Sequence, residues 1–197
     1  MARAFKRKGA RFVARLDDVE RQVVVGLLEQ THELLVPVLR EQTGDLFEDL
    51  VSRLGMPRLK DLGDDSTPAP RDPALDRLLP SAHREDPALA AEFRRLTEYG
   101  LRERKAANLA KAISALQDSD GDNVRLDREQ AQAMVVALTD VRLLLGERLG
   151  LRTDEDADAL QERLEAVSPE DPQLYLAGCY DFLTWLQESL IQALMGM

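Results

Sequence analysis

The chain has 197 residues, of which 44% are hydrophobic and only 5% aromatic, and its formal net charge is −10. That length fits a single domain, and a core built mainly from leucine, valine and alanine favours helices packed on helices. The single cysteine, Cys179, excludes an intramolecular disulfide. No apolar run is long enough for a signal peptide or a membrane span, so we expect a cytoplasmic protein without membrane contact.

The positive charge is concentrated at the start of the chain. Residues 1–16 contain six cations and no acid, so the rest of the chain carries a net charge of −16. An acidic body repels phosphate backbones, which argues against direct nucleic-acid binding. The basic arm is open to three interpretations: a contact with nucleic acid, a contact with an acidic partner, or a solvated tail, of which the last is the simplest. Its cations are Arg3, Lys6, Arg7, Lys8, Arg11 and Arg15.

The pattern begins as a strand followed by a long helix. Residues 12–16 alternate weakly and predict the strand. Asp17, with Glu20 three positions later, forms a capping-box pattern at the start of the helix. The apolar stripe of this helix extends to Leu39, but Pro37 predicts a kink or an end nearby.

The middle of the chain alternates between helical and irregular segments. A second helix is expected over residues 45–54, and residues 55–71, rich in glycine, proline and acids, predict a mobile surface loop. The pair Asp72-Pro73 predicts the start of a short helix. A highly charged helical region covers residues 87–116, where Gly100 predicts a kink or a break into two helices.

The rest of the chain is organised around residues 124–149, a short strand that runs directly into an amphipathic helix. Asp127 and Gln130 repeat the capping-box pattern at this junction. The tripeptide Arg-Leu-Asp occurs here and again at residues 15–17, which predicts a ribbon that pairs the two strands. Two further helices are expected before the C-terminus.

These elements predict a mostly α fold, a single-domain helical bundle of about six or seven helices with one short two-stranded β ribbon. Residues 1–16 would form a basic arm and strand. Residues 17–197 would form one helical domain, with the mobile loop at about 55–71.

The sequence shows no catalytic or cofactor motif. His32-Glu33 begins like a zinc-protease helix, but Val36 stands where the second histidine would be, and His83 is the only other histidine. Glycine-rich phosphate loops, nucleophile elbows and dinucleotide fingerprints are also missing. We therefore expect no enzyme, no cofactor and no metal or catalytic site. Cys179 lies on the apolar side of the last helix and is expected to be a core residue, not a redox site.

One acidic stretch resembles a calcium-binding loop. Four carboxylates occupy positions 1, 3, 5 and 12 of an EF-hand pattern. However, Asn123 replaces the glycine at position 6 and Arg125 replaces an apolar residue at position 8. A turn rich in Asp and Gly needs no metal, so calcium is the weaker interpretation. The carboxylates are Asp118, Asp120, Asp122 and Glu129.

A polar face of the charged region is the candidate partner site. Arg94 and Lys105 are 11 residues apart, close to three helical turns, and Asn108 follows Lys105 by one turn. Asn108 has poor helix propensity, which suggests a specific hydrogen bond. We predict that Arg94, Arg102, Lys105 and Asn108 bind a protein partner. In the alternative, the cations pair with the chain's own acids and Asn108 caps or bridges neighbouring helices.

Three segments share a pattern with a known family. They are DPALAAEFRRLT with LRERKAAN, VRLDREQAQA with TDVRLLLGERLG, and YDFLTWLQESL, at residues 86–108, 124–150 and 180–190. The basic start, KRKGARF at residues 6–12, also fits. On these residues the chain resembles the actinobacterial AosR-like family of oxidative-stress regulators. The resemblance covers most of the chain except the region near residues 55–71.

The resemblance implies a non-enzymatic, transcription-associated regulator that acts through protein–protein contact with a sigma factor or RNA polymerase, in an oxidative-stress or sulfur-metabolism setting. Genes of the family tend to lie beside genes of the ClpS adaptor and of sulfur metabolism, which implies a scaffold or adaptor linked to Clp-type proteolysis as the alternative. The sequence also leaves open whether the protein forms a homodimer. Family members sense oxidants through two cysteines spaced C-x-x-x-C, but Cys179 has no such partner, so an intramolecular redox switch is not expected.

Overall fold

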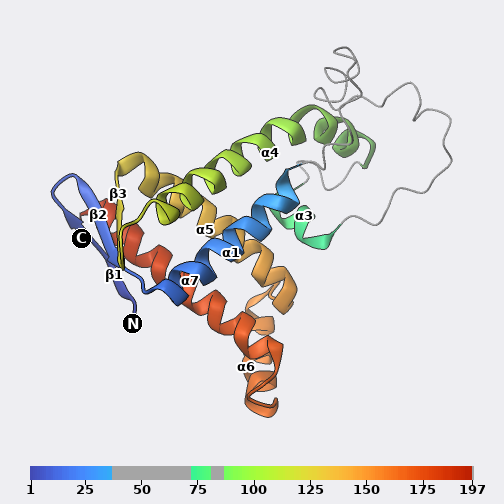
Figure 1. The fold of residues 1–197 in the computed structure, drawn as a ribbon. Coiled ribbons are helices and arrows are strands. Elements are labelled where there is room, and N and C mark those ends of the chain that lie inside the picture. Colours follow the sequence, from blue (N-terminus) through green and yellow to red (C-terminus); the bar gives the residue numbers. More distant parts are fainter. Residues whose placement is uncertain (37–71, 81–86, 197) are drawn as a thin grey trace.

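The computed structural model describes residues 1–36, 72–80 and 87–196, with side chains described throughout except at residues 87–96. The helix expected over residues 45–54 and the loop expected over 55–71 lie outside the described residues. The described part is mostly helical, with six helices and a small antiparallel sheet, which confirms the expected fold class (Figure 1). In chain order the elements are β1 (Arg3–Lys8), β2 (Arg11–Arg15), α1 (Asp18–Leu35), α3 (Pro73–Leu78), α4 (Pro87–Gln117), β3 (Asn123–Leu126), α5 (Arg128–Leu149), α6 (Asp154–Ala166) and α7 (Pro172–Met195).

The sheet has three strands in the order β1-β2-β3, each antiparallel to its neighbour. The predicted ribbon is confirmed in the pairing of β2 with β3, where Phe12 lies opposite Leu126 and Ala14 opposite Val124. The expectation of only two strands is wrong, because Arg3–Lys8 forms β1 and pairs with β2 around a turn at Gly9. The basic arm is therefore a β-hairpin and not a solvated tail.

Capping boxes fix both junctions between strand and helix, as the spacing of Asp17 and Glu20 and of Asp127 and Gln130 predicted. The Asp17 carboxylate accepts from the backbone N–H of Glu20 at 3.0 Å, and the Asp17 N–H donates to the Glu20 carboxylate at 2.9 Å. Asp127 and Gln130 make the same reciprocal pair at 2.8 and 2.9 Å. Each box satisfies two backbone donors at a helix start, so α1 and α5 leave the sheet in the same way.

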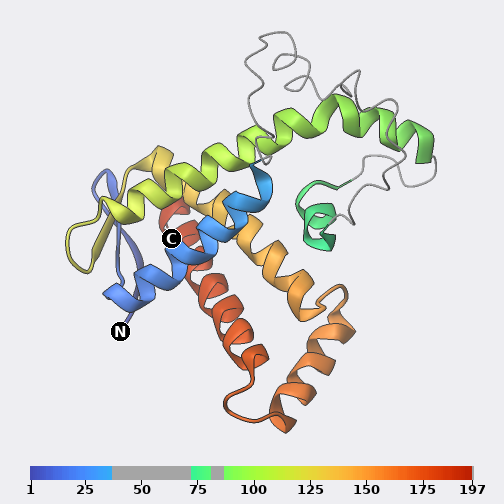
Figure 2. The same ribbon diagram turned by 45° about the vertical axis from the view of Figure 1, so that its right-hand side comes forward.

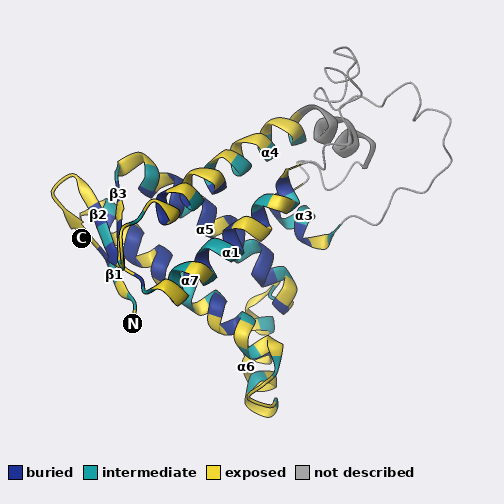
Figure 3. Cartoon of the chain, viewed as in Figure 1, coloured by how far each residue is buried: buried dark blue, intermediate teal, exposed yellow. Residues whose placement is uncertain are grey.

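Helix α5 is the central element of the bundle and contacts α1, α3, α4 and α7 (Figures 1 and 2). Its buried stripe joins the inner face of the sheet in one hydrophobic cluster, which Figure 3 shows as dark blue at the centre of the bundle. Leu16 at the end of β2, Leu138 on α5 and Leu183 on α7 are at most 1% exposed. Burying side chains of this size contributes about 1.5–3 kcal/mol each.

Two predictions about helix ends have different outcomes. Helix α1 ends at Leu35, before Pro37, as the proline predicted. Of the two outcomes predicted at Gly100, a kink or a break, the break into two helices is wrong, because α4 runs without interruption from Pro87 to Gln117. A glycine inside a helix costs only about 1 kcal/mol relative to alanine, and the packing of α4 against α1 and α5 outweighs that cost.

Helix α6 lies apart from the main core. Leu160 is its one buried residue, and it packs with Leu149 and Ala177 in a small separate cluster. Helix α7 leads from α6 back to the sheet, so α6 and the sheet lie at opposite ends of α7 (Figures 1 and 2). Gly150, with φ 77°, ends α5 in the left-handed conformation and turns the chain towards α6.

Candidate functional site

The predicted partner face on α4 turns largely towards the rest of the protein. The Arg102 guanidinium pairs with Glu98 at 2.7 Å, one helical turn away. It also donates to the carbonyl oxygens of Leu34 and Leu35 at 3.4 Å each. These carbonyls belong to the last turn of α1, where a cation satisfies unpaired acceptors and complements the helix dipole. Arg102 thus caps α1.

Lys105 is bound to a buried acid. Its ammonium pairs with the Asp140 carboxylate on α5, and the Asp140 side chain is only 1% exposed. Burial raises the pKa of Asp140, and the hydrogen bond from Lys105 opposes that shift. The second carboxylate oxygen of Asp140 has no hydrogen-bond partner. Lys105 therefore serves first to neutralise a charge between α4 and α5.

The other two predicted residues are less constrained. Asn108 is half-buried on α4, and within the described part of the chain its side chain makes no hydrogen bond. The specific hydrogen bond expected of Asn108 is therefore not formed there. Arg94 belongs to α4, but its side chain lies outside the described side chains. Partner binding by this face stays a prediction, and Arg102 and Lys105 have structural roles whatever its outcome.

The calcium-like stretch is occupied by internal contacts. Asp122 pairs with Arg15 at 2.7 Å, Glu129 pairs with Lys111, and Asp118 accepts from Ser114 at 3.0 Å. Among the described residues, no group of three or more His, Cys, Asp or Glu side chains is arranged to hold a metal ion. The sequence spacing is therefore explained by a turn that joins α4 to β3.

Cys179 is a core residue, as expected. It is 5% exposed on α7, within the main hydrophobic cluster. Burial raises the pKa of the Cys179 thiol, which lowers the fraction of reactive thiolate at neutral pH.

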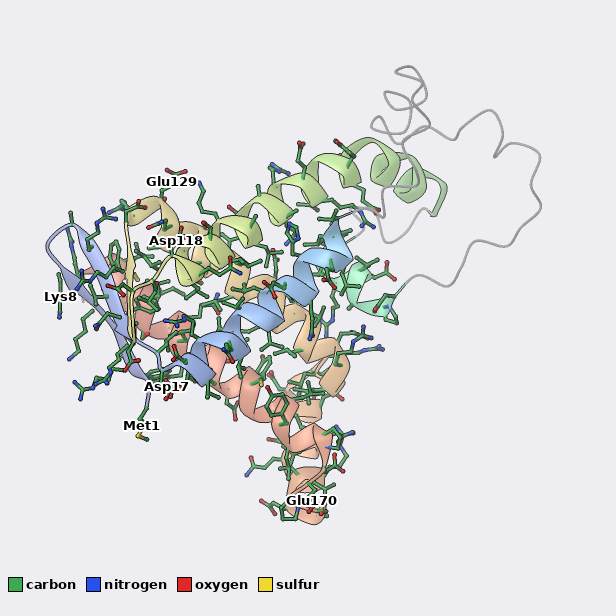
Figure 4. The ribbon with its side chains drawn as sticks, viewed as in Figure 1. Met1, Lys8, Asp17, Asp118, Glu129 and Glu170 are labelled. Carbon is green, nitrogen blue, oxygen red and sulfur yellow. The ribbon has the colours of Figure 1, made fainter. Side chains whose placement is uncertain are left out.

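The outer face of the sheet is the most distinctive surface that the described residues form. In an antiparallel sheet, residues directly opposite each other share a face. Across β1, β2 and β3, three rows follow from the register: Arg3 with Arg15 and Asn123, Lys6 with Val13 and Arg125, and Lys8 with Arg11. We call these eight residues the cationic face. Lys8, at the turn end of the hairpin, lies at the outer edge of the molecule (Figure 4).

Two of the six cations on this face are compensated and four are not. Arg15 pairs with Asp122 at 2.7 Å, and Arg11 lies 3.7 Å from Asp127. The remaining four make no ion pair in the structure as described, and each is exposed. These free cations are Arg3, Lys6, Lys8 and Arg125.

The sheet holds the cationic face in a fixed shape. On its inner face, Phe5, Phe12 and Val124 are at most 4% exposed and pack in the main core. The N–H of Phe5 donates to the Ser189 hydroxyl of α7 at 3.1 Å, which ties β1 to the last helix. Like charges directly opposite in a sheet are destabilising, yet Arg3 faces Arg15 and Lys8 faces Arg11.

The sequence contains a signal for this face in the alternation of its strands. Between Arg11 and Arg15 the pattern alternates charged or exposed residues with Phe12 and Ala14, and β3 alternates in the same way around Arg125. The pattern of β1 is hidden by an irregularity in the pairing between Arg3 and Lys6, which breaks the period of two.

Comparison with known proteins gives a family but no characterised relative. A family model described as "Domain of unknown function (DUF2017)" matches residues 2–194. No curated protein matches the chain. No solved structure matches it either. None of the described helices is long and apolar enough to cross a membrane.

Proposed function

We propose that this chain, which belongs to the DUF2017 family, is a non-enzymatic regulator that acts by protein–protein contact. The observation that carries the proposal is the cationic face. Four exposed cations without an internal partner are held on a rigid sheet in a protein whose net charge is −10. Complementary charge of this kind speeds association with an acidic surface and selects against basic ones.

The resemblance to the AosR-like family supplies the setting of the proposal. It points to a sigma factor or RNA polymerase as the partner, in transcription under oxidative stress or in sulfur metabolism. The alternative partner is a component of Clp-type proteolysis. Both are protein partners, so the cationic face fits either one.

A capture experiment from the native cytoplasm tests the proposal. The intact chain should retain a sigma factor or a polymerase subunit, and the variant Lys6→Gln/Arg125→Gln should lose it. Arg104→Gln is the matched control, because Arg104 is an exposed cation on α4, away from the cationic face. Each exposed ion pair contributes about 0.2–1 kcal/mol, so the double variant should bind its partner roughly 2- to 30-fold more weakly. Recovery of protease components without any polymerase component would favour the adaptor alternative, and equal recovery by all three chains would refute a role for the face.

A further inference from the structure

The cationic face has a spacing that restricts what can occupy it. Lys6, Val13 and Arg125 stand in one row across β1, β2 and β3. Opposite residues on neighbouring strands are about 5 Å apart, so Lys6 and Arg125 are separated by about 10 Å with a half-buried valine between them. The complementary ligand carries two anions about 10 Å apart with an apolar group between them.

An α-helix matches this spacing better than a strand. Residues i and i+7 of a helix share a face and are about 10.5 Å apart, with i+4 between them. In a strand, residues on one face are about 6.6 or 13 Å apart, because side chains alternate. The row therefore fits a helix with acids at i and i+7 and a small apolar residue at i+4.

Helix α6 of this chain has that pattern on its free side. Glu155, Ala159 and Glu162 stand at i, i+4 and i+7, and all three are exposed. They lie on the side of α6 opposite Leu160, the residue that attaches α6 to the rest of the protein. Asp158 and Glu165 flank the same side.

The acids of this side have no internal cations. Within the described part of the chain, no ion pair involves Glu155, Asp158, Glu162 or Glu165. Asp158 and Glu162 are one turn apart, a like-charge spacing that destabilises a helix. Arg163, the one cation of α6, donates to the Leu149 carbonyl at 3.3 Å and so turns towards the body. Four acids without an ion pair on α6 thus match four cations without an ion pair on the sheet, although Glu155 also accepts hydrogen bonds from its own backbone and from Thr153.

One chain cannot make this contact with itself. The sheet and α6 lie at opposite ends of α7 (Figures 1 and 2), which has 24 residues and is therefore about 36 Å long. We propose that α6 of one copy docks across the cationic face of a second copy, with Glu155 and Glu162 at Lys6 and Arg125 and Ala159 over Val13. Because the two surfaces differ, the contact is head to tail and can add further copies.

The regulatory consequence of this contact rests on the proposed function, because a docked α6 covers the face that the partner would use. Self-association then competes with partner binding for the cationic face. The cationic face comprises eight residues, fewer than the roughly 20–30 residues a side of a stable complex, so the association is weak and concentration-dependent. Single-stranded nucleic acid fits less well, since Phe5 and Phe12 both lie on the inner side and no aromatic ring of the sheet is free to stack on bases.

Sedimentation of the purified chain tests the contact without any partner. The weight-average mass should rise with protein concentration at about 50 mM salt, and the rise should disappear near 1 M salt, where the screening length is about 3 Å. Reversing the row in Lys6→Glu/Arg125→Glu, or reversing α6 in Glu155→Lys/Glu162→Lys, should weaken association about 10-fold. Arg104→Glu is the matched control and should associate as the intact chain does.

Combining both reversals in one chain should restore association, which a merely destabilised variant would not do. A second variant, Val13→Cys/Ala159→Cys, should form disulfide-linked multimers on mild oxidation. Either single substitution should form nothing longer than a dimer, because the native Cys179 is buried. Failure of both the charge swap and the disulfide trap would overturn the proposal. A monomer at all concentrations that still captures its partner would refute self-association and leave the proposed function intact. Binding of a 20-base-pair DNA duplex, weakened by Lys6→Glu/Arg125→Glu, with no self-association would instead assign the face to nucleic acid.

Discussion

Lys105 and Asp140 form an ion pair whose two members are unequally exposed. The Lys105 side chain is 17% exposed and reaches solvent, whereas Asp140 is 1% exposed on the central helix. Replacing both members of such a pair by apolar residues can leave the stability unchanged. Removing only one member leaves an uncompensated buried charge, which is strongly destabilising. Lys105 therefore matters most for what its loss would do to Asp140.

We predict that Lys105→Ala lowers the free energy of unfolding by about 3–5 kcal/mol, because Asp140 then remains buried without its cation. Chemical denaturation with a constant m-value measures this change. Arg104→Ala, one residue earlier and exposed, is the matched control and should change stability by less than about 0.5 kcal/mol. A small effect of Lys105→Ala would show that the pair is not desolvated.

The raised pKa of Asp140 predicts a specific pH dependence. The pKa of Asp140 in the folded state lies above its ordinary value of 3.8, so the folded state binds this proton more tightly than the unfolded state does. Between 3.8 and the raised value the folded state holds more protons than the unfolded state, so the contribution of Asp140 to stability falls as pH rises. The stability of the intact chain minus that of Asp140→Asn should therefore decrease with increasing pH from about pH 4. The contributions of the other acids are the same in both proteins and cancel in this difference. A flat or rising difference would contradict burial of the charged Asp140.

At the scale of single elements, the sequence predicted helix starts well and helix continuity poorly. Asp17 and Asp127 form the expected capping boxes because a cap depends on residues three positions apart. Gly100 misled the prediction because a local propensity of about 1 kcal/mol carries no information on the packing of α4 against two neighbours. The expected docking face used that break, and the real α4 instead directs Arg102 and Lys105 at α1 and α5.

The continuity of α4 leads to a prediction at Gly100. A Cβ added there has no atom within 4 Å, and the residue is exposed. Gly100→Ala should therefore stabilise the protein by about 0.5–1 kcal/mol through higher helix propensity. Thermal unfolding measures the gain, and Gly150→Ala is the informative contrast, since φ 77° there makes alanine unfavourable. A loss of stability in Gly100→Ala would indicate that α4 bends at this point.

For the whole molecule, the fold class followed from composition and periodicity, but the charged surface did not. The helical core depends on apolar spacing, which the sequence displays directly. The cationic face depends on the register between residues near position 10 and residues near position 125, and no local pattern contains that distance. The six cations in the first 16 residues are typical of a solvated tail. Only the pairing of the hairpin with β3 places this segment in a three-stranded sheet.

The division between the main core and the α6 cluster predicts unequal protection from hydrogen exchange. Helix α5 buries 11 residues, whereas α6 buries only Leu160. Local opening of α6 therefore exposes little apolar surface, and its amides should exchange through openings well below the global free energy of unfolding. Exchange followed by mass spectrometry should show α6 peptides labelled long before α5 peptides. Equal protection would mean that α6 is held by contacts absent from one isolated copy, as in the head-to-tail contact.

The bond from Phe5 to Ser189 also sets an order of events during synthesis, because its two residues are 184 positions apart. At about 5–20 residues per second, the first strand leaves the ribosome roughly 10 to 40 s before the helix that supports it. Closing so long a loop costs conformational entropy, and only the contacts of the completed core offset that cost. For most of that interval, until β3 (Asn123–Leu126) has been synthesised, the positively charged hairpin sequence has no third strand to pair with and lies next to the negatively charged ribosomal RNA. We expect the slowest folding step to be the docking of the hairpin onto the last helix, after the rest of the bundle has formed.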